Sequence, residues 1–236
     1  MHRLYVAPGQ VAGEEVLLQP EQTHYLRDVL RLQPGAELEI FDGDRGRWRG
    51  VLVAPGAVRL GEKLPPREKP LDVVIAQALV KGDKMDLIVQ KCTELGASRV
   101  IALAGERSVV KLDAARGMEK AARWQKIAQE AARQSGRDDV PEVDPPLDWD
   151  ALFAIARGRR ALVLDPAAGE RLSTAARGAD RLLLAVGPEG GFSAAELERA
   201  AANGFARVGL GPLVLRTETA ALAALAILQH LNGELG

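Results

Sequence analysis

"RLLLAVGPEGGFSAAELERAAANG", residues 181–204, combines the signals of a strand, a glycine-rich loop and a capped helix. The apolar run 182–186 is typical of a buried strand, and it ends at Gly-Pro-Glu-Gly-Gly. Ser193 and Glu196 have the spacing of a capping box, and Gly204 is placed to end the helix. The loop is either a tight connection or a place where a ligand approaches bare backbone, which glycine allows.

On both sides of this stretch, strand patterns alternate with helical patterns from residue 70 onward. We expect strands at residues 71–79, 99–103, 160–164, 181–186 and 206–210, and helices at residues 84–95, 113–134, 193–204 and 217–231. Such alternation is typical of an α/β domain with a mostly parallel sheet. The last helix is apolar around most of its circumference, so it needs burial on two sides.

The N-terminal part of the chain has a different pattern. Short strand patterns separated by Gly, Pro and Asp predict a small β-barrel or sandwich, interrupted by one helix at residues 21–32. The proline-rich, charged stretch at residues 62–70, "EKLPPREKP", is typical of a linker. We therefore expect two domains, residues 1–68 and residues 69–236.

Composition narrows the class of protein. Hydrophobic residues make up 47% of the 236 residues and charged residues 27%, which is ordinary for a soluble globular chain. No apolar run has the length of a membrane span, and the N-terminus has no signal-peptide pattern, so we expect no membrane association. A single cysteine, Cys92, favours a reducing compartment and hence a cytoplasmic location. Because Cys92 lies on an apolar helical stripe, we expect it in the core rather than at a reactive site.

Three loops follow predicted strands and would meet at one edge of the sheet. The first is Gly-Pro-Glu-Gly-Gly at 187–191, the second lies in "LGPLVLRTETAAL" at 210–222, and the third lies in "LVLDPAAG" at 162–169. In open α/β sheets, ligands bind beyond the carboxyl ends of the strands. These loops predict a cleft walled by backbone, suited to a flat, mostly neutral ligand such as an adenosine group.

Several common sites lack their motifs in this sequence. Neither the phosphate-loop pattern nor a G-x-G-x-x-G after the first strand is present. The three histidines lie far apart and one cysteine cannot build a zinc site, so we expect no metal. The nucleophile pattern G-x-S-x-G is also absent, so covalent catalysis has little support.

The C-terminal motifs resemble the signature of the SPOUT methyltransferases, and more narrowly that of the RsmE family. The motifs are "LAVGPEGGFSAAELERA" and "VGLGPLVLRTETAALAAL". Further matches are "LVKGDKMDLIVQKCTELGASRVIAL", "ERSV", "RWQKIAQEAARQSGR" and, in the N-terminal half, "HYLRDVLRLQPGAELEIFDG", so the resemblance covers nearly the whole chain.

The RsmE family methylates N3 of uracil in 16S, small-subunit ribosomal RNA, and the resemblance implies this activity here. It implies an α/β domain with a deep trefoil knot, a rare exception to the usual threading of chains. It also implies a preceding PUA-like β-barrel that binds RNA, S-adenosylmethionine as the cofactor, and a homodimer in which each site is completed near the partner chain.

The same resemblance implies roles for individual residues. The cofactor pocket would be formed by Leu164, Gly187, Glu189, Gly190, Leu210, Gly211, Leu215, Arg216, Thr217 and Ala220. Arg216 would stabilise the negative charge that develops on the uracil carbonyls. The N3 proton must be removed, and Glu189 or Glu218 could accept it, directly or through water. Glu218 has a purely structural alternative, because an acid in the first turn of a helix favours the helix dipole.

RNA contacts must come from local charge, because the net charge of the chain is only −1. Residues 107–137 carry eight basic and three acidic side chains, and the stretch 43–50, "GDRGRWRG", places three arginines around Trp48. We expect RNA contacts from Arg45, Arg47, Arg49, Arg123, Lys126, Arg133 and Arg137. Alternate strand residues share a face, so the three arginines could point together while Trp48 packs inward. The alternative is that both groups are solvated surface charges.

Two other classes of function compete with a methyltransferase. A β-barrel joined to an α/β domain with a basic helix could be a non-catalytic protein that binds or assembles ribosomal RNA. A nucleotide-binding hydrolase is a third class, although no phosphate loop or metal ligands favour it. Binding of S-adenosylmethionine but not of ATP would separate the methyltransferase from both.

Overall fold

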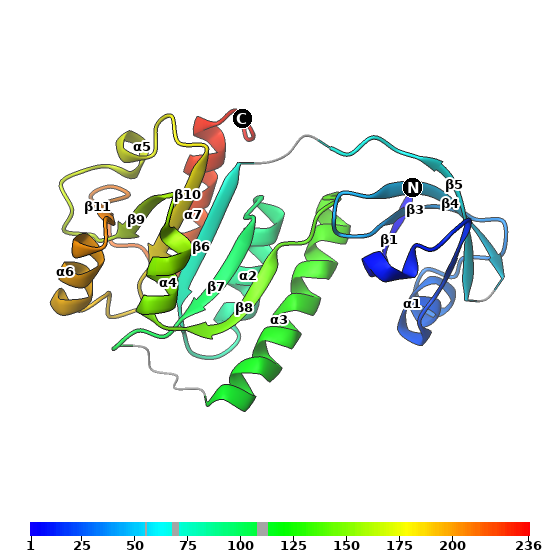
Figure 1. The fold of residues 1–236 in the computed structure, drawn as a ribbon, viewed down its shortest axis with the longest axis horizontal. Helices are drawn as coiled ribbons and strands as arrows, with labels where there is room; N and C mark the ends of the chain where they lie inside the picture. Colours follow the sequence, from blue (N-terminus) through cyan, green and yellow to red (C-terminus); the bar gives the residue numbers. More distant parts are fainter. Residues whose placement is uncertain (55, 68–70, 108–112) are drawn as a thin grey trace. The chain divides into compact units, whose positions relative to one another are not determined.

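The computed structural model describes residues 1–54, 56–67, 71–107 and 113–236 (Figure 1). The chain forms two compact units. The first comprises Met1–Lys69 and Gln129–Val140, and the second comprises Pro70–Ala128 and Pro141–Gly236. The expected domain boundary between residues 68 and 69 lies outside the described residues, as do Ser108 and Val109 of the "ERSV" motif.

The first unit is built on a five-stranded sheet in the order β1-β3-β4-β5-β2. Its strands are β1 (His2–Tyr5), β2 (Glu15–Leu17), β3 (Glu37–Phe41), β4 (Arg47–Ala54) and β5 (Ala57–Lys63). β1 pairs parallel with β3, and the other strand pairs are antiparallel. Its core contains Leu4, Val16, Leu38, Ile40 and Val58, all buried, so the predicted small β domain has its own hydrophobic core.

The helical part of the first unit differs from the single helix predicted at residues 21–32. It consists of α1 (Pro20–His24) followed by a π-helix, η2 (Tyr25–Val29), and a short 3-10 turn, η1 (Pro8–Gln10), precedes them. The amide of Leu30 donates to the carbonyl of Tyr25 at 2.9 Å, the five-residue spacing of a π-helix. The π-helix ends at Val29, three residues before the predicted limit, and Arg31 beyond it takes a left-handed φ of 55°, which helical backbone does not adopt.

The second unit contains a six-stranded sheet in the order β11-β9-β10-β6-β7-β8. Its strands are β6 (Asp72–Ala78), β7 (Arg99–Leu103), β8 (Glu142–Leu147), β9 (Arg160–Leu164), β10 (Arg181–Val186) and β11 (Ala206–Val208). Its helices are α2 (Lys84–Glu94), α3 (Ala114–Ser135), α4 (Trp149–Ala156), α5 (Leu172–Ala175), α6 (Ala194–Ala202) and α7 (Thr217–Leu231); the last residues of α3 belong to the first unit. All its strand pairs are parallel, which confirms the predicted parallel sheet.

Helices cover both faces of this sheet (Figure 1). On one face, α4 and α6 pack on alternate residues of the central strands through Trp149, Leu152 and Ala200. On the other face, α7 contacts β6 and β10 and packs against α2. The ends of the strands lie between these helix layers, and the connecting loops can form a site there.

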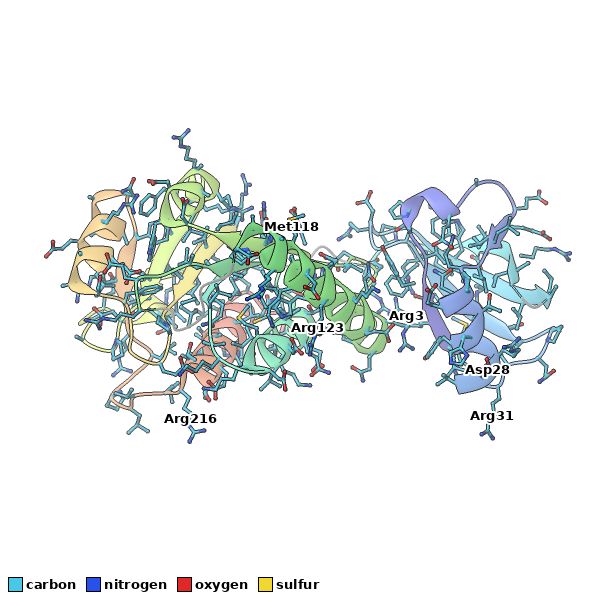
Figure 2. All side chains as sticks on the ribbon, turned by 90° about the horizontal axis from the view of Figure 1, so that it is seen from below. Arg3, Asp28, Arg31, Met118, Arg123 and Arg216 are labelled. Atoms are coloured by element: carbon cyan, nitrogen blue, oxygen red, sulfur yellow. The ribbon has the colours of Figure 1, made fainter. Side chains whose placement is uncertain are left out.

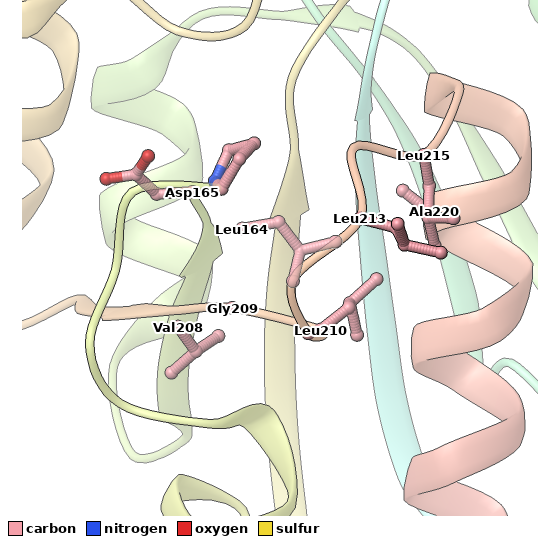
Figure 3. A pocket seen from close by; sticks show the side chains of 10 residues that line it. Leu164, Asp165, Val208, Gly209, Leu210, Leu213, Leu215 and Ala220 are labelled. Atoms are coloured by element: carbon pink, nitrogen blue, oxygen red, sulfur yellow. The ribbon is translucent and has the colours of Figure 1, made fainter.

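The loop after β9 encloses the chain as it leaves β11 (Figure 3). The amide of Asp165 donates to the carbonyl of Val208 at 3.0 Å, and the amide of Gly209 donates to the carbonyl of Glu170 at 2.8 Å. The amide of Leu172 in turn donates to the carbonyl of Gly209 at 3.0 Å. A Cβ on Gly209 would lie 3.3 Å from the carbonyl oxygen of Ala168, so glycine suits this passage.

Cys92 lies on α2 among the buried residues of the second unit. Cys92 is completely buried, and burial raises the pKa of its thiol to about 12, which confirms a core residue. Among the described residues, no helix is long and apolar enough to cross a membrane.

Candidate functional site

A pocket of about 290 Å³ opens at the carboxyl ends of the central strands. It is lined by Leu164, Pro166, Val186, Gly187, Pro188, Glu189, Gly191, Val214, Leu215, Arg216, Thr217 and Ala220. A second cavity of about 50 Å³ shares several of these residues, among them Leu164, Leu215 and Ala220. Val208, Gly209, Leu210, Gly211 and Leu213 also line the second cavity. Figure 3 shows the side chains of Leu164, Leu210 and Leu213 converging there.

The order of the strands explains why the loops after β9, β10 and β11 meet. β9 lies between β11 and β10, and all three run parallel, so their carboxyl ends are adjacent at one edge. The predicted convergence of the three loops is therefore present. Gly187 follows β10 directly, and a Cβ there would lie 3.2 Å from the amide nitrogen of Phe192, which is tighter than most real contacts. The glycine lets the loop fold back on itself beside the pocket.

A buried hydrogen-bond chain fixes the floor of the pocket. The hydroxyl of Thr217 donates to the carbonyl of Gly187 at 2.6 Å and accepts from Nε2 of Gln77 at 2.9 Å. Gln77 comes from the end of β6 and is completely buried, while Thr217 begins α7. The sequence analysis missed Gln77, although a lone polar residue in the apolar run of β6 was a signal for it.

Two of the predicted carboxylates share one lysine at the rim of the pocket. Nζ of Lys84 lies 2.9 Å from Oε1 of Glu189 and 3.4 Å from Oε2 of Glu218. The hydrogen bond from Lys84 is the main reason that the pKa of Glu189 lies below its ordinary value. The same bond to Glu189 raises the pKa of Lys84. Lys84 was not among the predicted site residues.

The loop after β10 is held on its outer side by Glu196 and Arg107. The carboxylate of Glu196 is buried and accepts from the amides of Ser193 (2.8 Å) and Glu106 (2.9 Å), and from Nε1 of Trp149 (3.1 Å). The Ser193 hydroxyl in turn accepts from the amide of Glu196 at 3.1 Å, which confirms the capping box. Nη1 of Arg107 donates to the carbonyl of Gly190 at 2.9 Å.

The structure places nine of the ten predicted cofactor residues along the two cavities, and Gly190 is the one that does not line them. Its neighbour Gly191, with a left-handed φ of 67°, takes that position instead. A Cβ on Gly190 would meet only Cδ of Arg107, at 3.9 Å. The role of Gly190 in binding a ligand stays a prediction, and in this structure its carbonyl accepts a hydrogen bond from Arg107.

The predicted catalytic residues have different surroundings. Arg216 lines the large pocket, and Figure 2 shows its side chain extending outward. It makes no side-chain hydrogen bond or ion pair with any residue that the structure describes, so its guanidinium is free to meet a substrate. Glu189 also lines the pocket and is exposed, whereas Glu218 lies at the start of α7 with only 15% of its side chain exposed. Oε2 of Glu218 is buried and has no hydrogen-bond partner within the described part of the chain.

The three arginines of the first unit do not form one open basic face. Arg47 and Arg49 lie outward on β4 while Trp48 packs against the core. Arg47, however, is 13% exposed and is bound to the buried carboxylate of Glu39 at 3.0 Å. Arg49 is exposed beside Glu62. Arg45 is outside the strand at a positive φ and donates to the carbonyl of Arg67. The expectation that the three side chains point together is thus wrong.

Acidic partners also neutralise much of the basic stretch on and after α3. Arg123 pairs with Asp86 in the second unit (Figure 2 labels Arg123). In the first unit, Arg133 pairs with Glu130 and stacks on the Tyr25 ring, with its guanidinium 4.2 Å from the ring centroid. Lys126 is exposed and has no ion-pair partner among the described residues, so it remains the strongest candidate of this group for a phosphate contact.

Arg137, the last residue predicted to contact RNA, forms an ion pair with Asp139 at 2.7 Å, and its side chain is only 10% exposed.

Among the described residues, no group of three or more His, Cys, Asp or Glu side chains is placed to hold a metal ion. Glu189 and Arg216 line the pocket, while Lys84 and Glu218 lie beside it through the ion pairs of Lys84.

Comparison with known proteins gives matches over both units. The family described as the RNA methyltransferase domain matches residues 67–229, and the family described as the RNA methyltransferase PUA domain matches residues 18–58. The chain is 39% identical over 235 residues to the ribosomal RNA small subunit methyltransferase E of Synechocystis, with 95% of this chain and 76% of that protein covered.

Two solved structures are similar over almost the whole chain. One is a ribosomal RNA small subunit methyltransferase E from Neisseria gonorrhoeae bound to S-adenosylmethionine, with 31% identity, a TM-score of 0.90 and 98% of each chain covered. The other is a methyltransferase from Legionella pneumophila in complex with the same cofactor, with 34% identity, a TM-score of 0.88, and 97% of this chain and 96% of that chain covered.

Proposed function

The chain belongs to the family of ribosomal RNA small subunit methyltransferases E, and we propose on this premise that it transfers a methyl group from S-adenosylmethionine to N3 of a uridine in 16S ribosomal RNA. The first unit is PUA-like, and the second is a SPOUT methyltransferase domain with a parallel sheet. The enclosure of Val208 and Gly209 by the loop after β9 supports the knotted threading of that domain. The pocket built by three loops at the carboxyl ends of β9, β10 and β11 carries the proposal.

The residues of the pocket fit S-adenosylmethionine. Leu164, Val186 and Leu215 supply apolar walls for an adenine ring, and the glycines expose backbone groups that can bind its polar edge. The pocket volume of about 290 Å³ is close to the lower end for small-molecule sites. A nucleoside triphosphate fits less well, because the rim carries two carboxylates and the chain has no phosphate loop.

When bound, the cofactor supplies an electrophilic methyl group on a sulfonium. The chain must then orient the uracil, remove the N3 proton and stabilise the resulting negative charge. Arg216 lines the pocket with a free guanidinium and is suited to stabilise charge on the uracil carbonyls. Because Arg216 is exposed and immediately precedes α7, an RNA base can reach it from solvent.

Glu218 is the better of the two candidate bases. The hydrogen bond from Lys84 holds the pKa of Glu189 below its ordinary value, which makes its carboxylate a weaker proton acceptor. Oε2 of Glu218 is buried and lies 3.4 Å from Nζ of Lys84 as an ion pair, without a hydrogen bond to any residue in the described part of the chain. Such an oxygen is able to accept a proton or a hydrogen bond from a bound substrate. We therefore assign the acceptance of the N3 proton to Glu218, directly or through water.

The homodimer is part of the same proposal. The residues of α7 that face its own unit are buried, among them Ala221, Leu225 and Leu228. The opposite side remains only half-buried although it is equally apolar; it comprises Leu222, Ala223, Ala226 and Ile227. A second copy of the chain would cover this stripe. A cytoplasmic location follows from the substrate, since small ribosomal subunits are found there.

Calorimetric titration with S-adenosylmethionine and with ATP tests the function. We expect binding of the first ligand only. Nucleoside mass spectrometry of ribosomal RNA from a strain that lacks the gene should then show the loss of one methyluridine. A chain that binds RNA but neither small ligand would support the non-catalytic RNA-binding protein instead.

A further inference from the structure

Lys84 connects two segments that line the cofactor pocket. It is the first residue of α2 and does not itself line the pocket. Glu189, at 2.9 Å, belongs to the loop after β10, and Glu218, at 3.4 Å, belongs to the first turn of α7. Both segments contribute residues to the lining of the pocket, and the hydrogen bond from Thr217 to Gly187 also links them.

We propose that Lys84 is a positioning residue that joins the two walls of the pocket at its rim and thereby holds the cofactor. This inference rests on the proposed function. The side chain of Lys84 is 34% exposed, so it contributes little to the core, and its charged partners are Glu189 and Glu218. Lys81 acts electrostatically on Glu189 as well, but no ion pair connects it to Glu218. Lys84 is therefore the only lysine paired with both carboxylates among the residues that the structure describes.

The chemistry of the cluster favours a role in holding the pocket rather than in proton transfer. Its two acids raise the pKa of Lys84, with the hydrogen bond to Glu189 as the main cause, so the ammonium keeps its proton and its charge near neutral pH. A fixed cation between two carboxylates prevents their mutual repulsion, which would otherwise separate the loop from α7. Because the cluster is partly exposed, salt should weaken its effect.

The test compares cofactor affinity in matched variants by calorimetry. Lys84→Met keeps the length of the side chain and removes the charge, and we expect it to raise the Kd for S-adenosylmethionine about three- to tenfold at low salt. Lys84→Arg should bind within about twofold of the unaltered chain. Lys91→Met is the control: it removes a lysine of similar exposure from the same helix, whose partner is Glu94 at 2.8 Å. It should leave the Kd unchanged.

Two further measurements distinguish positioning from general stability. The difference in Kd between Lys84→Met and the unaltered chain should shrink at about 1 M salt, where the Debye length is roughly 3 Å. Glu189→Gln should cost less affinity in the Lys84→Met background than alone, because the shared interaction is already lost. Melting curves of the ligand-free variants show whether each of them is folded.

The outcomes separate this inference from the function on which it rests. Failure of the unaltered chain to bind the cofactor would overturn the methyltransferase and the role of Lys84 together. If the unaltered chain binds and Lys84→Met binds equally well, only the inference about Lys84 is wrong. A loss that is the same at low and high salt, or that Lys84→Arg does not restore, would also overturn it.

Discussion

Gly187 is the residue at which a single added carbon should have the largest effect on the pocket. Its Cβ would lie 3.2 Å from the amide nitrogen of Phe192 and 3.3 Å from Cα of Gly191, which are backbone atoms that cannot move aside cheaply. We expect Gly187→Ala to weaken S-adenosylmethionine binding by tenfold or more, about 1.4 kcal/mol. Calorimetric titration with S-adenosylmethionine measures this change in Kd.

Gly190→Ala is the matched control, because its Cβ meets only Cδ of Arg107 at 3.9 Å. It should bind the cofactor within about threefold of the unaltered chain, a difference below 1 kcal/mol. Equal losses at both glycines would mean that the whole loop, rather than the close approach at Gly187, determines affinity.

Arg216 should affect turnover more than binding. It is the N-cap residue of α7, lines the pocket and has no side-chain partner among the described residues, so its proposed interaction exists only with the reacting base. Loss of one group that stabilises developing charge typically costs about 10²–10³ in rate. We expect Arg216→Ala to lower kcat by that factor while the Kd for the cofactor changes little. Single-turnover assays on ribosomal RNA measure the rate, and near-normal turnover would remove Arg216 from the mechanism.

Sequence patterns predicted the pocket better than they predicted its polar contacts. Loop positions such as Gly187 and Leu215 follow directly from strand ends, which hydrophobic runs mark clearly. Lys84 and Gln77 come from a helix and a strand 100 or more residues away from their partners, and no local pattern pairs them. Gly190 lies in the predicted loop but does not line the pocket, because the sequence pattern places the loop and not the direction in which each of its residues faces.

Among the secondary-structure elements, α6 depends on a single buried carboxylate. Glu196 caps its own helix and also binds the amide of Glu106 and the indole of Trp149, so it joins α6 to the loop after β7 and to α4. Burial alone raises the pKa of Glu196. The N–H donors of Ser193, Glu106 and Trp149 outweigh this and hold that pKa below its ordinary value.

Glu196→Gln tests this arrangement through its pH dependence. At pH 7 it should destabilise the chain by about 1–3 kcal/mol, because an amide nitrogen would face donors that need an acceptor. A carboxyl whose pKa is lowered by folding stabilises the protein above its unfolded pKa, and this contribution is lost as the pH falls through the folded pKa. The difference in the free energy of unfolding between Glu196→Gln and the unaltered chain should therefore shrink below about pH 4.3. Urea unfolding at pH 7 and at pH 3.5 measures it, and a constant difference would contradict the network.

The elements that the sequence analysis missed have a physical explanation. β8 contains Pro145 and Pro146, which argue against a strand, yet it lies at the edge of the sheet where one side needs no partner. The helix predicted at residues 21–32 is divided into α1 and a π-helix, in which hydrogen bonds with five-residue spacing, such as that from Leu30 to Tyr25, alter the winding. Periodicity detects the apolar face of such a segment but not the hydrogen-bond spacing within it.

For the molecule as a whole, the threading of the chain was implied only by resemblance to a family. The bonds of Gly209 to Glu170 and Leu172 are made between segments that are far apart in sequence, and each segment alone has ordinary loop composition. Hydrophobic periodicity predicts the strands and helices on either side but not the order in which the chain passes through a loop. The loop after β9 and the loop after β11, two of the three loops at the pocket, are nevertheless held in place by the bonds of Gly209.

The apolar surface of α7 predicts how two copies of the chain assemble. α7 is apolar all round, and its own unit buries only one side, leaving Leu222, Ala226 and Ile227 half-buried. A helix of this kind requires a second partner, and the alanines allow a close approach. The protein should therefore elute with twice its chain mass of 25.2 kDa.

Ile227→Arg places a charge in the middle of the half-buried stripe and should shift the protein to the monomer, as measured by light scattering after gel filtration. Met118→Arg is the control, because Met118 is an apolar side chain on α3 that is already 61% exposed (Figure 2), and it should remain dimeric. Methyl transfer should fall together with dimer content as the Ile227→Arg protein is diluted, since the family resemblance implies that each site is completed near the partner. A dimer that survives Ile227→Arg would show that another surface joins the two copies.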